Sequence, residues 1–167
     1  MNALRASRPH MPGYGVVGPD EGSGLLAWSW AEERLLASRN YWVASAWPDG
    51  RPHVMPVWGV WHAGALWFSS SRRARKTRNL TADPRCAVAT ENAVEPVVVE
   101  GAAALVTDME AIAAMLALVN AKYGTDIELS FYDPAVNATF RVQPRRVFAL
   151  TEEDFTGSPT RWDFTVD

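Results

Sequence analysis

Three runs of strand-forming residues, joined by two short turns, constrain the fold of this chain more than any other feature. The runs are rich in aromatic and β-branched side chains and cover residues 41–47, 51–62 and 65–70. The first turn is Pro48-Asp49-Gly50, in which proline presets φ and glycine supplies a positive φ, and the second is Ala63-Gly64. Because strands joined by such tight turns pair with each other, we expect an antiparallel meander here.

Three more strands and three helices are expected around this meander. The strands are predicted at residues 85–91, 96–107 and 139–150, with a bulge at Gly101. One helix is predicted after the capping box Ser29–Glu32, one in the basic stretch that follows Ser71, and one from the capping box Thr107–Glu110 to Gly124. Closure of the sheet would remove the edges that such apolar strands otherwise expose. The sequence therefore predicts a mainly β (α+β) fold, a six-stranded antiparallel β-barrel with three inserted helices.

We expect one domain over residues 25–167, preceded by an irregular arm over residues 1–24 that is rich in Gly, Pro and Ser. The arm contains Gly13-Tyr14-Gly15-Val16-Val17-Gly18, which matches the spacing of the dinucleotide-binding fingerprint. That fingerprint needs a strand before it and a helix after it, and prolines on both sides exclude this context. The tail that begins at Phe155 is too aromatic for a free end, so we expect it to dock on the domain.

Composition narrows the class of function. The formal net charge is −3, which argues against general binding of nucleic acids. The single cysteine, Cys86, excludes an internal disulfide. We identify neither a signal peptide nor an apolar run long enough to cross a membrane, so the expected location is the cytoplasm.

A local basic segment stands out in this acidic chain. A strand end leads into three hydroxyls, and five cations follow within seven residues: Arg72, Arg73, Arg75, Lys76 and Arg78. We expect a helix N-terminus capped by serine at this point. Free backbone N–H groups, the helix dipole and charged side chains would then converge on one spot. The segment predicts an anion-binding site, with a solvated basic helix face as the alternative.

Pro56 lies in the middle of the strand predicted at residues 51–62, both faces of which are partly apolar. Proline cannot donate to a sheet ladder, so it indicates a sheet edge, a bulge or a break. A broken ladder leaves backbone groups free to bond a flat heterocycle, whereas the structural alternative is a simple bulge.

Side-chain acid–base chemistry finds little support. His53 and His62 are nine residues apart on one predicted strand and therefore on opposite faces, which argues against a metal site. Cys86 heads a strand and is interpreted as a small buried hydrophobe. These features are typical of a protein that binds a reactive cofactor and leaves the chemistry to it.

An ordered set of segments adds a family resemblance that covers nearly the whole chain. The segments are Arg39–Val43, Pro48–Trp61, Arg75–Leu80, Asp83–Arg85 and Val99–Gly101. With these segments in this order, the chain resembles the pyridoxamine-5′-phosphate-oxidase-like split β-barrel family, and within it the flavin/deazaflavin oxidoreductases that use the deazaflavin coenzyme F-420.

The resemblance implies a homodimer of FMN-binding split-barrel type with cofactors at the subunit interface. The tricyclic ring would lie along Met55, Pro56, Val57 and Trp58, and the phosphate would contact Ser69, Ser70, Arg75 and Lys76, with Asn79 in the same segment. Arg161 and Trp162 resemble a family ending that lies near the site, lent across the dimer. The Arg-Leu-x-Pro ending of true pyridoxamine phosphate oxidases is absent, which argues against vitamin B6 oxidation.

The expected function is hydride transfer from reduced coenzyme F-420 to a small, conjugated organic substrate. Three alternatives stay open: an FMN-dependent oxidoreductase, a non-catalytic carrier of a flavin or deazaflavin, and a haem-binding split barrel, for which the sequence places no histidine as an axial ligand. The sequence predicts no catalytic side chain and does not identify the substrate.

Overall fold

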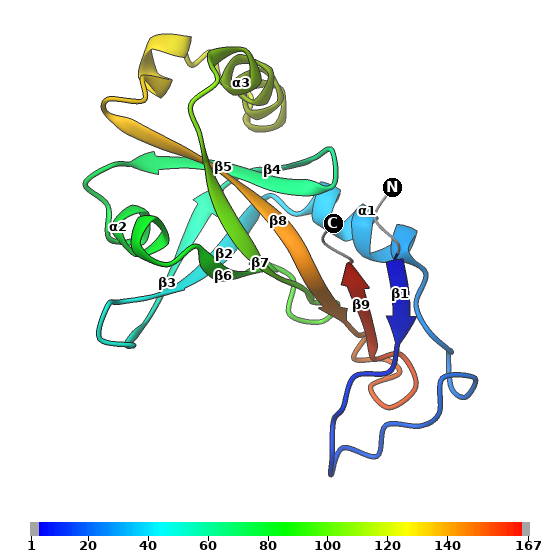
Figure 1. The fold of residues 1–167 in the computed structure, drawn as a ribbon. Coiled ribbons are helices and arrows are strands. Elements are labelled where there is room, and N and C mark those ends of the chain that lie inside the picture. The colour runs from blue at the N-terminus through cyan, green and yellow to red at the C-terminus, as the bar shows by residue number, and fades with distance from the viewer. Residues whose placement is uncertain (1–3, 165–167) are drawn as a thin grey trace.

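The computed structural model describes residues 4–164, and this part of the chain forms one antiparallel sheet flanked by helices (Figure 1). The helical elements are α1 (Trp28–Ala37), α2 (Arg75–Ala82), α3 (Met109–Tyr123) and the 3₁₀ helix η1 (Leu129–Tyr132). The strands are β1 (Leu4–Ser7), β2 (Asn40–Ala46), β3 (Pro52–Trp58), β4 (Val60–His62), β5 (Ala65–Ser71), β6 (Arg85–Thr90), β7 (Val97–Val106), β8 (Asn137–Ala149) and β9 (Thr160–Phe164).

Residues 4–164 thus contain nine strands, and the prediction of six was wrong. All six expected segments are strands, but the one predicted at residues 51–62 is divided into β3 and β4 at Gly59. A Cβ at Gly59 would lie 2.9 Å from the carbonyl oxygen of Trp67, so the chain bends where only glycine allows the close approach. The other two strands are β1, inside the N-terminal arm, and β9, in the tail.

The sheet is not closed, which corrects the expectation of a closed barrel. Its strands follow the order β1-β9-β8-β7-β6-β2-β3, while β5 pairs with β8 and β4. Within residues 4–164, β3 pairs along this path with β2 alone and ends the sheet, so Pro56 lies on an edge strand, where a proline is tolerated. Helix α2 packs against β2, β3 and β5 and so covers the seam between β3 and β5.

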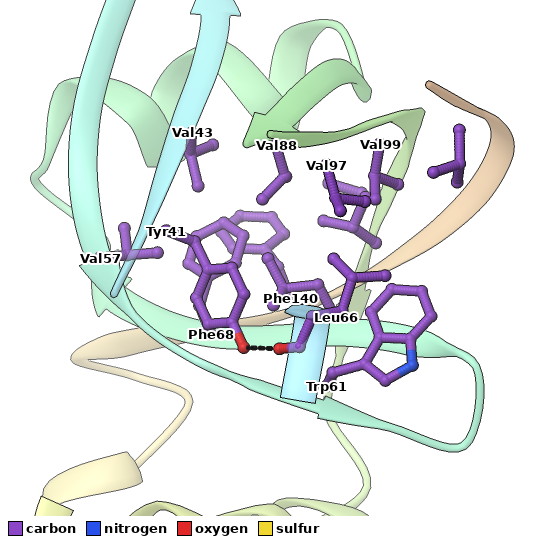
Figure 2. Close-up of a cluster of buried hydrophobic side chains, with 14 of the residues drawn as sticks. Tyr41, Val43, Val57, Trp61, Leu66, Phe68, Val88, Val97, Val99 and Phe140 are labelled. Carbon is purple, nitrogen blue, oxygen red and sulfur yellow. Dashed lines mark hydrogen bonds between the residues drawn. The ribbon is translucent and has the colours of Figure 1, made fainter. Parts of the chain in front are cut away.

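The main core lies inside the curved sheet. Side chains that alternate along β2, such as Tyr41 and Val43, point inward and are buried, whereas Trp42 between them points outward. They meet the inward side chains of β5, β6, β7 and β8 in the cluster drawn in Figure 2. In this cluster, the ring centroids of Phe68 and Phe140 are 5.4 Å apart. The expected bulge at Gly101 is confirmed by a register shift between β7 and β8.

A second, smaller core lies between α3 and the outer side of β4 and β5. Its members include Val60 and Trp67 from the strands and Tyr132 from η1. One face of α3 is buried in it, through Ile112, Met115, Leu116, Val119 and Tyr123.

Helix starts differ from the predicted caps. Helix α1 begins at Trp28, so Ser29 is inside the helix and does not cap it. Helix α2 follows Ala74, which makes no side-chain cap, because the three serines still belong to β5. At α3 the cap is Asp108, whose carboxylate accepts from the N–H of Glu110 at 2.9 Å.

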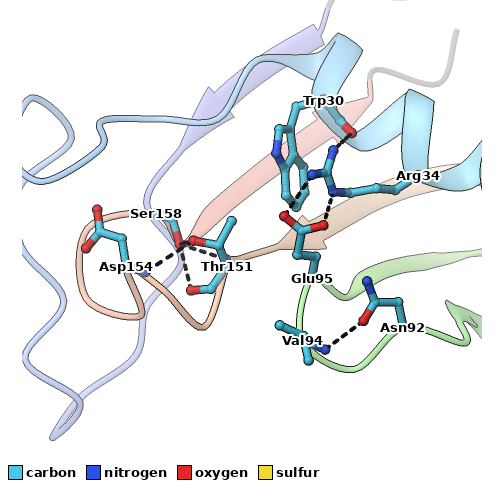
Figure 3. A network of polar contacts seen from close by, with 8 residues as sticks. All are labelled: Trp30, Arg34, Asn92, Val94, Glu95, Thr151, Asp154 and Ser158. Atoms are coloured by element: carbon cyan, nitrogen blue, oxygen red, sulfur yellow. Dashed lines mark hydrogen bonds and ion pairs between the residues drawn. The ribbon is translucent and has the colours of Figure 1, made fainter.

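The arm and the tail meet, as expected for a docked tail. Strand β9 lies between β8 and β1, and its Trp162 is buried in the main core. Figure 3 shows two contacts near this region, the ion pair of Arg34 with Glu95 and the hydrogen bond of Thr151 with Ser158. The guanidinium of Arg34 lies 2.8 Å from the carboxylate of Glu95 and stacks on the Trp30 ring. The backbone N–H of Thr151 donates to the hydroxyl of Ser158 in the turn before β9. Residues 12–15 form a turn and residues 16–18 are irregular, while β1 ends at Ser7 and α1 begins only at Trp28. No strand leads directly into this segment and no helix directly follows it, so the dinucleotide fingerprint is excluded.

Candidate functional site

The site with the strongest claim to function lies at the seam where β5 ends beside the edge strand β3. We call it the seam site. A cleft of about 390 Å³ opens there between the sheet and the α3–η1 segment. It is lined by Trp58, by residues 68–71 of β5, and by Val119, Ile127, Phe131, Tyr132 and Asn137. The structure thus brings together Trp58, Ser69 and Ser70, three of the residues predicted to bind a cofactor.

Lys76 joins this group from the first turn of α2. Its ammonium Nζ donates to the hydroxyl of Ser70 over a long 3.4 Å. Burial lowers the pKa of Lys76, because a half-buried ammonium loses part of its hydration. Within residues 4–164, no carboxylate lies within ion-pair distance of Lys76. A charge of this kind gains most from an anionic ligand.

The neighbouring arginines also lack acidic partners. In the described part of the chain, none of Arg72, Arg73, Arg75 and Arg78 forms an ion pair. The guanidinium of Arg75 lies 3.6 Å above the ring centroid of Trp47, and that of Arg72 donates to the carbonyl of Pro134. The N-terminal N–H groups of α2 add to the same positive field. The segment therefore presents uncompensated positive charge beside the two serines.

The four residues predicted along β3 have different environments. Val57 is buried in the main core, whereas Met55 and Trp58 are 46% and 48% exposed. Trp58 stacks on Tyr123 of α3 with ring centroids 4.3 Å apart and an interplanar angle of 6°. This stacking fixes the indole as one wall of the cleft. Because β3 is unpaired on one side, its backbone can still bond a ligand there.

Asn79 has a structural position between α2 and β2. It is 1% exposed, and its side-chain N–H donates to the hydroxyl of Ser45 at 3.1 Å. Its carbonyl oxygen is buried and has no hydrogen-bond partner within residues 4–164. The contact with Ser45 holds the basic helix against the sheet.

Within one chain, Arg161 and Trp162 are not brought to the seam site. On β8, the partner of Ser69 is Thr139 and the partner of Arg161 is Phe148. Nine residues of strand separate those two partners, a distance of about 30 Å. The ring centroids of Trp162 and Trp28 are 5.6 Å apart, and Trp162 is part of the main core.

Sequence reasoning missed the wall opposite the serines. Between α3 and β8, the 3₁₀ helix η1 places Tyr132 in the second core and leaves Phe131 62% exposed at the cleft. The aromatic pair Phe131-Tyr132 in an otherwise polar segment is the sequence feature that could have predicted this wall. The stacking of Tyr123 on Trp58 was not predicted, because the position of Tyr123 fitted the buried face of a helix.

Other chemistry has little support at this site or elsewhere. Burial raises the pKa of the Cys86 thiol to about 12, which leaves it unreactive at neutral pH. Residues 4–164 contain no cluster of three potential metal ligands. Among the helices described, none has the length and apolar character needed to cross a membrane.

Comparison with known proteins gives a consistent fold. A family model described as pyridoxamine 5′-phosphate oxidase matches residues 30–156. A conserved hypothetical protein of Mycobacterium tuberculosis is 22% identical with a TM-score of 0.69, over 77% of this chain and 87% of that one.

Two further solved structures have functional descriptions. One described as an F-420 reductase is 25% identical with a TM-score of 0.58, over 70% of this chain and 94% of that one. The heme storage protein HutZ of Vibrio cholerae is 19% identical with a TM-score of 0.62, over 73% and 93%. No curated protein matches the chain.

Proposed function

The chain belongs to the pyridoxamine 5′-phosphate oxidase family, and from that premise we propose that it is an oxidoreductase dependent on the deazaflavin coenzyme F-420. Its reaction would be hydride transfer to a small, conjugated organic substrate. The observation that carries the proposal is the half-buried Lys76 beside Ser70, with unpaired cations around it. The 25% identity to a structure described as an F-420 reductase supports the choice of cofactor.

The residues of the seam site fit an anionic cofactor. Lys76, Arg75, Ser69 and Ser70 would hold its phosphate through charge-assisted hydrogen bonds. The edge of β3 from Met55 to Trp58 would receive its ring, since this edge combines apolar side chains with unpaired backbone groups. When bound, the reduced cofactor supplies the hydride. The protein supplies orientation, an apolar wall and exclusion of water.

The cleft favours a planar substrate. Trp58 and Phe131 expose aromatic surface to it, while the serines and Asn137 line another part with hydrogen-bonding groups. Flat, conjugated molecules gain dispersion energy from aromatic walls. The single titratable side chain among the described lining residues is Tyr132, whose pKa is raised by burial. It therefore stays neutral at physiological pH and can donate a hydrogen bond.

Two alternatives correspond to specific observations. Lys76 and the serines alone could bind the single phosphate of FMN through hydrogen bonds, which favours an FMN-dependent oxidoreductase. The shortage of titratable groups at the cleft favours a carrier that binds a flavin or deazaflavin without turnover.

Turnover separates an enzyme from a carrier. We expect the purified protein to oxidise reduced coenzyme F-420 when an activated alkene or a quinone is added, and not to do so without an acceptor. The loss of reduced-cofactor absorbance is the measurement, and the product is identified by mass spectrometry. Binding of the cofactor without turnover, over a broad panel of acceptors, would favour the carrier.

We further propose that the protein is a homodimer with the site at the interface. The outer side of β2 and β3 exposes apolar residues that one chain leaves uncovered, including Trp42 at 45% and Val54 at 56%. Together with the unpaired edge of β3, they form a surface suited to a second copy. Across such an interface, the partner would bring its own Arg161 near the cofactor, whereas Trp162 is buried in the main core of its own chain.

The expected result in sedimentation velocity is a dimer at micromolar concentration. Trp42→Lys should convert it to a monomer, because a lysine would be buried without a partner in the contact. Tyr14→Lys is the matched control, since Tyr14 is exposed on the N-terminal arm, away from this surface. A stable wild-type monomer would refute the dimer and remove the basis for a tail lent across it.

A further inference from the structure

Lysine is rare in this chain, and both lysines are partly buried. Lys76 and Lys122 are the only lysines among the 16 side chains of Lys and Arg. Lys76 belongs to the seam site. Lys122 lies at the end of α3 and lines a different cleft of about 460 Å³, between α1, α3 and β4. This second cleft contains none of the residues assigned to the seam site.

The ammonium of Lys122 is held by two acceptors. Its Nζ donates to the carbonyl of Gly59 at 2.8 Å and to the hydroxyl oxygen of Tyr41 at 3.1 Å. Tyr41 gives its own proton to the carbonyl of Leu35, so its oxygen can only accept from the lysine. An ammonium has three N–H groups. Within residues 4–164, the third N–H of Lys122 has no acceptor.

Lys122 lines the second cleft, and its hydrogen-bond network includes two residues that are next in sequence to other lining residues. Gly59 precedes Val60 and Leu35 precedes Leu36, and both Val60 and Leu36 line the cleft. The remaining lining residues are Trp61, His62, Leu118 and Ala121, so most of the wall is apolar. The second cleft therefore combines hydrocarbon surface with a cation that has one N–H without an acceptor in residues 4–164.

We propose that the second cleft binds a small apolar carboxylate. Its hydrocarbon part would lie against Leu36, Trp61 and Leu118, and its carboxylate would accept the third N–H of Lys122. A monoanion matches the one cation of the cleft, whereas a phosphate dianion would require further donors that the apolar wall does not offer. The site needs no cofactor, so it does not rest on the proposed function.

The charge state of Lys122 makes binding depend on pH. Burial lowers its pKa to about 8, the nearby Glu91 opposes this and Arg39 adds to it. Tyr41 and Tyr123, whose rings lie 4.6 Å and 5.5 Å from Nζ, have raised pKa values and stay neutral in this range, and His62 is the remaining titratable group of the cleft. A bound carboxylate favours the ammonium, so affinity should fall as the pH rises above about 8.

Calorimetric titration with octanoate and with octan-1-ol tests the proposal on the wild-type protein. The two probes share a chain, so only the carboxylate distinguishes them. At pH about 7 we expect octanoate to bind at least about tenfold more tightly than the alcohol, in line with a charged hydrogen bond. Between pH about 7 and about 9.5 the advantage of octanoate should disappear, while the alcohol is unaffected.

Variants locate the site. Lys122→Met should reduce octanoate binding to the level of the alcohol, and Lys76→Met should leave it unchanged. Equal affinities of octanoate and octan-1-ol for the wild type would overturn the proposal. So would a loss of octanoate binding that follows Lys76→Met, because the acid would then bind at the seam site.

Discussion

Replacing Lys76 with alanine is expected to raise the dissociation constant of the cofactor at least about tenfold. The lysine is half-buried, has Ser70 as its one hydrogen-bond partner in the described part of the chain, and lies in the first turn of a helix whose N-terminus already favours an anion. A hydrogen bond to a charged group contributes roughly 1.5–3 kcal/mol, which corresponds to a factor of ten or more in binding. Fluorescence titration with coenzyme F-420 is the measurement. Arg75→Ala should act in the same direction.

Thermal stability should change little in Lys76→Ala, since burial of this ammonium is a cost that the alanine removes. Arg51→Ala is the matched control: it removes one cation from the β2–β3 turn, where Arg51 pairs with Asp49 on the surface. Lys76→Arg keeps the charge and should retain part of the affinity. Unchanged binding in both Lys76→Ala and Arg75→Ala would mean that the phosphate lies elsewhere.

Much of the fold could be predicted from local patterns. The aromatic and β-branched side chains of residues 41–47 predicted β2, because this preference depends on residues close in sequence. Pro56 indicated an edge, a bulge or a break, and the structure has it on an edge strand. The division of β3 from β4 could not be predicted, because it depends on the close approach of Gly59 to Trp67. Strand β1 was missed for a similar reason, since its four residues are stabilised by pairing with β9 at the other end of the chain.

The candidate site shows the same division. The serines, Lys76 and Trp58 could be named from the sequence and its family resemblance, and the structure places them around one seam. Phe131 could not be assigned to the cleft, because its position depends on how η1 packs against α3. Val57 was named with its neighbours, yet strand alternation turns it into the core. A motif identifies a segment, whereas burial decides which of its side chains can touch a ligand.

The choice of cofactor should be visible as a difference in affinity. We expect coenzyme F-420 to bind at least about tenfold more tightly than FMN, because one or more additional charged hydrogen bonds contribute to its binding free energy. FMN offers one phosphate, whereas the deazaflavin coenzyme has a phosphodiester followed by several glutamate carboxylates. Arg72, Arg73 and Arg78 have no acidic partner in the described part of the chain and can contact this longer anionic tail.

Salt and tail length distinguish this explanation from a simple preference for the ring. Contacts to exposed arginines are screened over a Debye length of about 10 Å at moderate ionic strength, whereas the half-buried Lys76 is screened less. The advantage of longer glutamate tails should therefore shrink as salt is added, and the affinity for FMN should change less. Arg73→Ala should remove part of the tail-length preference and leave FMN binding unaffected. Micromolar binding of FMN without measurable binding of the deazaflavin would instead identify an FMN-dependent protein, in which the basic segment is a solvated helix face.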